Sequence, residues 1–200
     1  MDNGELSRRY DEIIERCVSV FKAKTKDYGP TWLFFRDQSF VDQLWIKARR
    51  IRTLEENGDK SLVGEGREDE YLGIVNYGVI MLMRMQNPEL FPDSDAVVAD
   101  TEAYYTVRLD DMEKAYRRAF AGVKALMERK NHDYGAAWTE MHLNSITDQI
   151  IVKIFRMKNI IASGGKLIAS EGLDAQISDV INYSIFALLK MSGIGAQAAL

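Results

Sequence analysis

The feature that most constrains this chain is an internal repeat. When the sequence is shifted by 106 positions, residues 24–85 lie on residues 130–191 without a gap. Eighteen of these 62 positions are identical, and the stretch KTKDYGPTW of the first copy returns as KNHDYGAAW in the second. A gapless match of this length indicates a duplicated unit, and a duplicated unit sets the architecture before any single residue is considered.

Each copy is predicted to form three helices. In the first helix of each copy, apolar residues recur at spacings of three and four, which is the pattern of an amphipathic helix. These residues are Tyr10, Ile13, Ile14, Cys17, Val18 and Phe21 in the first copy, and Leu109, Met112, Tyr116, Phe120, Val123 and Met127 in the second. The third helix is expected from about residue 66 to 85, and again from about residue 172 to 191.

The second helix is predicted to begin at Ser39 in the first copy and at Ser145 in the second. An aspartate follows three residues later in both copies, as Asp42 and Asp148, and this spacing resembles a capping box with aspartate in place of glutamate. The helix is expected to end before the next glycine of each copy, because glycine readily takes the left-handed conformation that follows a helix.

Neither copy shows the alternating pattern of a strand. The sequence therefore predicts an all-α fold, in which two tandem three-helix repeats pack as a pseudo-twofold helical bundle. We expect residues 1–90 to form the first repeat, 91–106 the linker and 107–200 the second repeat, together as one compact unit. The stretch QNPELFPDSDAVVADTEA, around the linker, holds two of the three prolines and several acids, as is typical of a connector.

Composition excludes several classes of protein. Thirty acidic residues against 26 basic ones give a net charge of -4, which argues against a nucleic-acid-binding protein, because duplex binders carry a basic surplus. No stretch approaches the ~20 apolar residues of a membrane span, and the polar N-terminus has no apolar signal segment. Cys17 is the single cysteine, so no disulfide can form within the chain. We expect a cytoplasmic protein in which Cys17 is buried.

Basic residues recur at matched positions of the two copies. Lys47 and Arg50 lie one helical turn apart, as do Lys153 and Arg156, so the same helix face is basic in both. Such a face can bind phosphate oxygens, although a solvated charged face is the alternative interpretation. The residues expected to contact phosphate are Lys24, Lys47, Arg50, Lys130, Lys153 and Arg156.

The repeated Asp-Tyr-Gly sequence and its tryptophan follow the first helix of each copy. Glycine and tryptophan fit a helix stop, but many polar residues would serve in such a turn, so the aspartate and tyrosine suggest a further role. Asp27 and Asp133 are therefore candidates for orienting substrate or water. Candidates for stacking on a base or for supporting the site are Tyr28, Trp32, Tyr134, Trp138, Asn76 and Asn182. For the two asparagines, a buried structural hydrogen bond is the alternative.

Together these motifs resemble a known family. The pattern K-x-x-DYG-x-x-W, then S-x-x-D-Q, K-x-x-R, and E-G followed ten residues on by N-Y, is similar to a bacterial and phage family of unknown function that is labelled a nucleotide-modification-associated domain. Single-copy phage members carry acids at i, i+4 and i+8 of the last helix. That stripe is similar in kind to the acidic helix of MazG-like all-α nucleoside triphosphate pyrophosphatases, which hold Mg²⁺ on helical carboxylates.

The resemblance implies a Mg²⁺-dependent hydrolase of a nucleotide, similar to a nucleoside triphosphate pyrophosphohydrolase. A non-catalytic protein that binds a nucleotide or another phosphorylated ligand is the alternative. On the first reading a small-molecule nucleotide is the partner, no nucleic acid or membrane is involved, and assembly into a homo-oligomer stays open. The expected Mg²⁺ or Mn²⁺ ligands are Glu65, Asp69, Glu171 and Asp179, and the expected catalytic residues are Asp27, Asp133 and Asp179.

Both copies depart from the acidic stripe of the phage members. The first copy has Gly73 where the third acid belongs, and the second copy has Ala175 where the middle acid belongs. Two interpretations follow. Either the copies pool their acids at one shared site, or the hydrolytic site has decayed.

Overall fold

The structure is a computed structural model that describes residues 3–105, 107–167 and 171–193. Every regular element in these ranges is a helix, which confirms the all-α prediction. Across the same residues, no helix is long and apolar enough to cross a membrane.

The helices of the two copies follow the same order and begin 106 residues apart. The first repeat contains α1 (Asn3–Tyr28), the short 3₁₀ helix η1 (Thr31–Phe34), α2 (Asp37–Glu56) and α3 (Arg67–Gln86). The second repeat contains α6 (Leu109–Tyr134), η2 (Ala137–Glu140), α7 (Leu143–Ala162) and α8 (Leu173–Met191). The duplication seen in the sequence is therefore also a duplication of secondary structure. Gly58 and Gly164 follow α2 and α7 in the left-handed conformation, as predicted.

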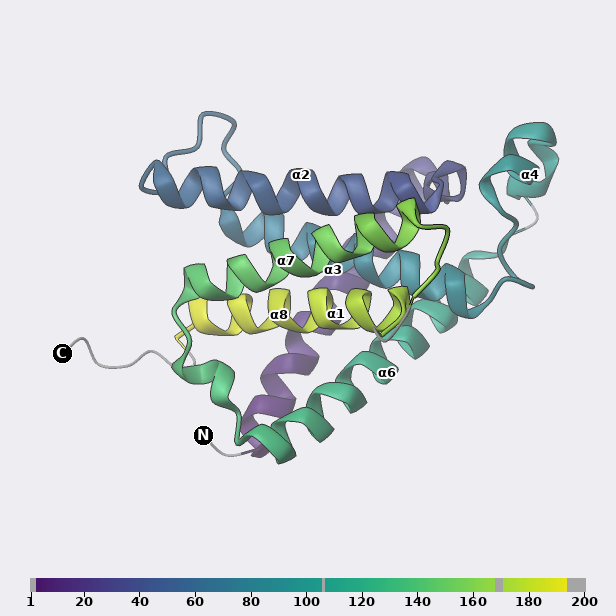
Figure 1. The fold of residues 1–200 in the computed structure, drawn as a ribbon. Coiled ribbons are helices and arrows are strands. Elements are labelled where there is room, and N and C mark those ends of the chain that lie inside the picture. The colour runs from purple at the N-terminus through teal and green to yellow at the C-terminus, as the bar shows by residue number, and fades with distance from the viewer. Residues whose placement is uncertain (1–2, 106, 168–170, 194–200) are drawn as a thin grey trace.

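Four helices form a bundle to which both repeats contribute equally. Helix α2 packs against α3, α3 against α8, α8 against α7, and α7 against α2. Figure 1 shows α2, α7 and α8 with nearly parallel axes, while the long helices α1 and α6 run obliquely to them. Each repeat alone would leave one side of its α2–α3 or α7–α8 pair open to water, so burial of apolar surface favours the paired arrangement.

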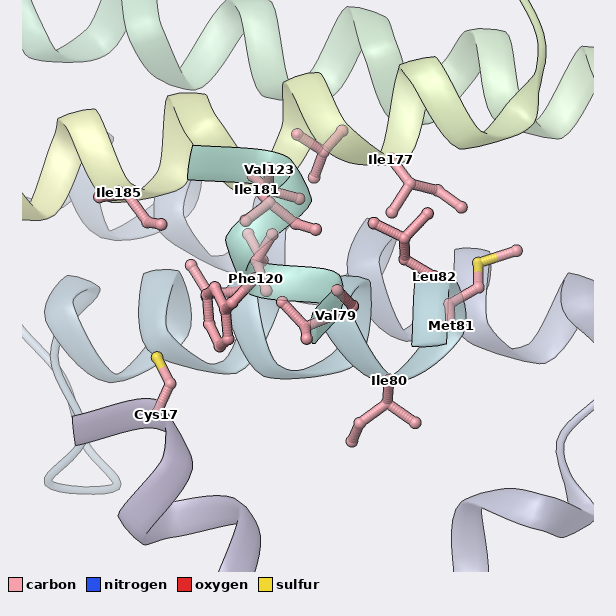
Figure 2. Packing of buried hydrophobic residues seen from close by; sticks show 14 of the residues in the cluster. Cys17, Val79, Ile80, Met81, Leu82, Phe120, Val123, Ile177, Ile181 and Ile185 are labelled. Atoms are coloured by element: carbon pink, nitrogen blue, oxygen red, sulfur yellow. The ribbon is translucent and has the colours of Figure 1, made fainter. Parts of the chain in front are cut away.

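The core lies where the two repeats meet. Figure 2 shows apolar side chains from α1, α3, α6 and α8 gathered in one cluster, among them Cys17, Val79, Phe120 and Ile181. Helices α3 and α8 approach closely at Gly78, because a Cβ atom there would lie 2.8 Å from Cγ1 of Ile181. The expectation that Cys17 is buried is confirmed, and burial raises the pKa of its thiol to about 12.

Two hydrogen bonds join the repeats in a reciprocal way. The hydroxyl of Tyr10 in α1 donates to Oδ1 of Asn182 in α8, and the hydroxyl of Tyr116 in α6 donates to Oδ1 of Asn76 in α3, both at 2.7 Å. Residues 10 and 116 are equivalent, as are 76 and 182, so exchanging the repeats converts one bond into the other. Reciprocal contacts of this kind are what a twofold relation between two copies produces.

The predicted capping role of Asp42 and Asp148 is wrong. Helices α2 and α7 begin at Asp37 and Leu143, so each aspartate is the sixth residue of its helix, in the second turn rather than at a cap. Asp42 instead accepts a 2.7 Å bond from Lys158, and Asp148 accepts a 2.8 Å bond from Arg52. These ion pairs are again equivalent under exchange of the repeats. The two aspartates are thus retained where α2 and α7 face each other.

The connector between the repeats contains two short helices, α4 (Ser94–Ala99) and α5 (Glu102–Tyr105). It packs on the first repeat near η1. Phe91 meets the ring of Trp32 edge-on at 5.4 Å, and the Tyr104 hydroxyl donates a 2.9 Å hydrogen bond to the Tyr28 carbonyl. The expected linker is therefore also a cover over the end of α1.

Candidate functional site

A cavity of about 500 Å³ lies in the first repeat, between the C-terminal end of α1, η1, α2 and α3. All of its lining residues fall between Val20 and Ile80. The volume is within the usual range for small-molecule sites. Its charged and amide lining residues are Lys24, Lys47, Glu65, Asp69, Glu70 and Asn76, and its aromatic ones are Phe21, Tyr28, Trp32, Phe35 and Tyr77. The cavity therefore combines two cations, several carboxylates and a set of aromatic rings.

The Asp-Tyr-Gly turn forms one wall of this cavity. Gly29 has φ +69°, and its N–H closes α1 with a 2.8 Å bond to the Thr25 carbonyl. A side chain at this position would be strained, and its Cβ would lie 1.9 Å from the Tyr104 hydroxyl. Glycine is thus required both by the helix stop and by the connector that packs on it. The turn leaves the Tyr28 side chain 69% exposed beside the cavity.

Trp32 is buried in the wall next to this turn, and its indole Nε1 has no hydrogen-bond partner. Trp138 is also buried with its Nε1 unpartnered, and it stacks on Phe186 with a centroid distance of 4.3 Å. Trp32 meets Phe91 of the connector and Trp138 meets Phe186 of α8, so both are packing residues in the core. A buried donor without a partner usually costs about 1–3 kcal/mol.

The predicted basic face of α2 is present, but both of its residues, Lys47 and Arg50, are already paired. Lys47 Nζ lies 3.2 Å from Oε2 of Glu70, and Arg50 bonds the other oxygen of Glu70. Arg50 also donates to Oε2 of Glu65 at 3.1 Å. Lys24 differs, because no ion pair or hydrogen bond joins its ammonium group to another residue in the described part of the chain. Lys24 is therefore the cation of the cavity that is free to bind an anion.

Glu70 is the residue that the sequence prediction missed. It is only 3% exposed, and it holds Lys47 and Arg50 together. The second copy has Gln176 at this position, so a comparison of the copies pointed away from a shared role. Gln176 is buried, and its Oε1 has no partner. Glu70 lies on α3, whereas Lys47 and Arg50 lie on α2. The sequence does not show that these two helices pack together, so it gave no signal for the contact.

The four predicted metal ligands do not lie together. Glu65 and Asp69 line the cavity of the first repeat, where Asp69 accepts a 2.8 Å bond from the N–H of Gly66 and so caps α3. Glu171 is exposed in the second repeat, and Asp179 is buried there. Within residues 3–105, 107–167 and 171–193, no group of three or more His, Cys, Asp or Glu side chains is arranged to hold a metal ion. The described carboxylates thus do not form the pooled acidic site considered above.

Asp179 is held by two lysines of its own repeat. Lys130 in α6 and Lys153 in α7 each donate a 2.6 Å bond to a different oxygen of its carboxylate. Burial by itself raises the pKa of Asp179, but the hydrogen bonds and charges of the two lysines outweigh it and leave the pKa below its ordinary value. Asp179 is consequently ionised at neutral pH and already has two cationic partners.

The remaining predicted residues lie at the surface or in the core. Asp27 and Asp133 are exposed in the last turns of α1 and α6, and Asp27 does not line the cavity. Tyr134 is 72% exposed, like its counterpart in the first repeat. Arg156 is exposed, and no ion pair links it to another of the described residues.

The asparagines have structural hydrogen bonds on both sides of their amides. Besides accepting from tyrosine, Asn76 donates to the Leu72 carbonyl at 2.9 Å, and Asn182 donates to the Val123 carbonyl at 3.3 Å. Asn182 is only 5% exposed, so it has the buried structural hydrogen bond that was the alternative interpretation for the two asparagines. Asn76 has the same bonds but also lines the cavity.

The family described as nucleotide modification associated domain 1 matches the chain twice, over residues 24–85 and 130–191. These are the two segments that the internal repeat defines. No significant match was found among curated proteins or solved structures.

Proposed function

Because the chain belongs to the nucleotide modification associated domain 1 family, we propose that its first repeat binds a nucleotide in the cavity between α1, α2 and α3. The observation that carries the proposal is the position of Lys24. This ammonium group has no partner among the described residues, and it lines the same cavity as Tyr28 and Trp32. A cation beside aromatic rings matches the two parts of a nucleotide, a phosphate group and a base.

The other polar groups of the cavity fit this ligand. Lys47 is held at the wall by Glu70, so its charge is in place but partly neutralised. The exposed carboxylates of Glu65 and Asp69 can accept hydrogen bonds from sugar hydroxyls or base amino groups. The buried Nε1 of Trp32 offers a donor to an incoming oxygen.

Nucleotide hydrolysis is the second proposal, and the carboxylates in the same cavity favour it. Mg²⁺ is usually held by one or two protein carboxylates together with substrate phosphates, so a complete protein cage is not required. Glu65 and Asp69 are the residues that would contact Mg²⁺ or Mn²⁺ brought in with a nucleoside triphosphate. The cation would neutralise phosphate charge there. Glu70 and Asp179 are buried in their ion pairs and are not assigned this role. Glu65 also pairs with Arg50, but its side chain is 65% exposed, so it would exchange that bond for the cation.

A binding experiment with a matched pair of lysine variants tests the first proposal. Thermal melting is measured with nucleoside mono-, di- and triphosphates, with and without Mg²⁺, because a ligand that binds only the native state raises its stability by about 2.7 kcal/mol at 100 times its dissociation constant. Lys24→Ala should weaken the binding of the responding nucleotide by roughly 10- to 100-fold, as expected for a lost charge-assisted hydrogen bond.

Lys26→Ala is the control, because Lys26 is exposed, lies two residues away and does not line the cavity. It should leave the affinity unchanged. Equal effects of the two substitutions, or no response to any nucleotide, would refute the binding proposal. Pyrophosphate and phosphate release, measured in the same samples, decides between binding alone and hydrolysis. Glu65→Gln should abolish a Mg²⁺-dependent release if the second proposal holds.

A further inference from the structure

The two repeats carry the same two lysines, but their third helices present different acids to these lysines. Lys24 and Lys47 correspond to Lys130 and Lys153, whereas Gly73 in α3 corresponds to Asp179 in α8. In the second repeat both lysines bind the Asp179 carboxylate, one on each oxygen and each at 2.6 Å. The second repeat thus contains an anion, supplied by the protein, between its two lysines.

The first repeat has a cavity at the corresponding place. Gly73 lines this cavity together with Lys24 and Lys47. A Cβ atom at Gly73 would lie 2.7 Å from Cε of Lys47, so the lysine side chain extends across the position from which an acid would project. Lys47 turns to Glu70 instead, and Lys24 keeps no partner among the residues that the structure describes.

The chemistry of the two arrangements is the same. A carboxylate that accepts from two ammonium groups makes the short, charge-assisted bonds that phosphate oxygens make with lysine. Asp179 is 6% exposed and the Lys153 side chain only 14%, so an external anion would have to replace a largely buried ion pair, although Lys130 is 45% exposed. Separating such a pair is costly, because it leaves a buried charge without a partner. An external phosphate therefore has little to gain in the second repeat while Asp179 is present.

We propose that Asp179 takes the place of the ligand phosphate in the second repeat, so that each chain binds one nucleotide, in the first repeat only. The inference rests on the proposed function for its ligand. Beyond the proposed function, it gives the number of nucleotides bound per chain and names Asp179 as the residue that prevents binding in the second repeat. The second repeat then acts as a structural partner, which supplies Tyr116 to hold Asn76 in the cavity wall.

Exchanging the residue between the repeats tests this proposal. Isothermal titration with ADP and with inorganic pyrophosphate measures the number of sites per chain. The wild type should bind one ligand. Gly73→Asp should place a carboxylate beside Lys24 and reduce affinity by at least about tenfold, the loss expected when one charge-assisted bond is replaced. Gly73→Asn is the control, because it adds a side chain of similar size without charge, and it should retain most of the affinity.

Asp179→Gly should free Lys130 and Lys153 and create a second site. This new site should disappear when Lys130→Ala is added, whereas Lys24→Ala should remove only the original one. Circular dichroism establishes that each variant is folded. If Asp179→Gly does not fold, Asp179→Asn replaces it and should also create a second site, and the comparison of Gly73→Asp with Gly73→Asn remains as the second test. Equal binding by Gly73→Asp and Gly73→Asn would overturn the proposal.

The outcomes separate this inference from the proposed function. A wild type that binds one ligand, with a folded Asp179→Gly variant that also binds only one, overturns the role of Asp179 and leaves the first-repeat site intact. Two sites in the wild type overturn it as well. A wild type that binds nothing, with an Asp179→Gly variant that binds one ligand, supports the role of Asp179 and refutes the first-repeat site.

Discussion

The hydrogen bond between Tyr10 and Asn182 offers a direct test of how the repeats are held together. Tyr10 is fully buried, and its hydroxyl is the donor to Oδ1 of Asn182 at 2.7 Å. Tyr10→Phe keeps the ring and removes only the hydroxyl, so Asn182 would keep a buried oxygen without a donor. A loss of this kind should lower the free energy of unfolding by about 1–3 kcal/mol. For a chain of this size, the melting temperature should fall by about 2–4 °C for each kcal/mol.

Tyr116→Phe is the matched variant in the other repeat. It removes the equivalent donor, but Asn76 is partly exposed and lines the cavity, so water can replace the lost hydroxyl. Its cost should therefore be near the net value of one hydrogen bond, about 1 kcal/mol. Both variants are measured by urea unfolding followed by circular dichroism. A smaller cost for Tyr10→Phe than for Tyr116→Phe would contradict the burial argument.

A double-mutant cycle adds the decisive measurement. Asn182→Leu alone leaves the Tyr10 hydroxyl unpaired, whereas the double variant removes both partners of the bond. The two costs should therefore not add, and a coupling energy of at least about 0.5 kcal/mol is expected for residues in contact. Additive costs would show that α1 and α8 are not joined by this bond, and the reciprocal packing of the repeats would then be wrong.

Two further predictions concern single residues. Cys17 should not react with a thiol reagent at pH 8 in the native protein and should react once per chain in urea, because it is fully buried and its pKa is about 12; rapid labelling of the native state would contradict this. The pKa of Asp179 is lowered in the folded protein, so its ion pairs stabilise the fold fully at pH values above 3.8, the ordinary pKa of an aspartate. This stabilisation is lost as the pH falls through the lower pKa of the folded state. The stability advantage of the wild type over Asp179→Asn should thus be full at pH 7 and shrink below about pH 4, and a difference that does not vary with pH would refute it.

Several features of this protein follow from local sequence. The gapless repeat predicts that equivalent helices begin 106 residues apart, and they do. The third helix was expected from about residue 66, and α3 begins at Arg67. The spacing of apolar residues and the conformation of glycine depend on neighbours within a few residues. The positions of the helices can therefore be predicted from the local sequence.

Polar residues were harder to interpret, because their partners lie far along the chain. Asp42 was expected to cap a helix, but its partner is Lys158, 116 residues away. No role was predicted for Glu70, because its function is to pair with two cations of α2, Lys47 and Arg50. The same applies to Asp179, which was expected to bind metal and instead bonds Lys130 and Lys153. Charge and size alone do not indicate which opposite charge will be nearest.

The sequence by itself determined the all-α class, the duplication, the positions of the helices and the two sets of matched cations. The tertiary structure decided which of these cations are free. Lys24 and Lys130 each stand three residues before an Asp-Tyr-Gly sequence, yet Lys130 meets a carboxylate from α8 whereas Lys24 faces a cavity. The physical reason is that ion pairing in a helical bundle is set by which helix faces pack together. Helix α8 presents Asp179 to Lys130, whereas α3 has Gly73 at the equivalent position and pairs Lys47 with Glu70 instead.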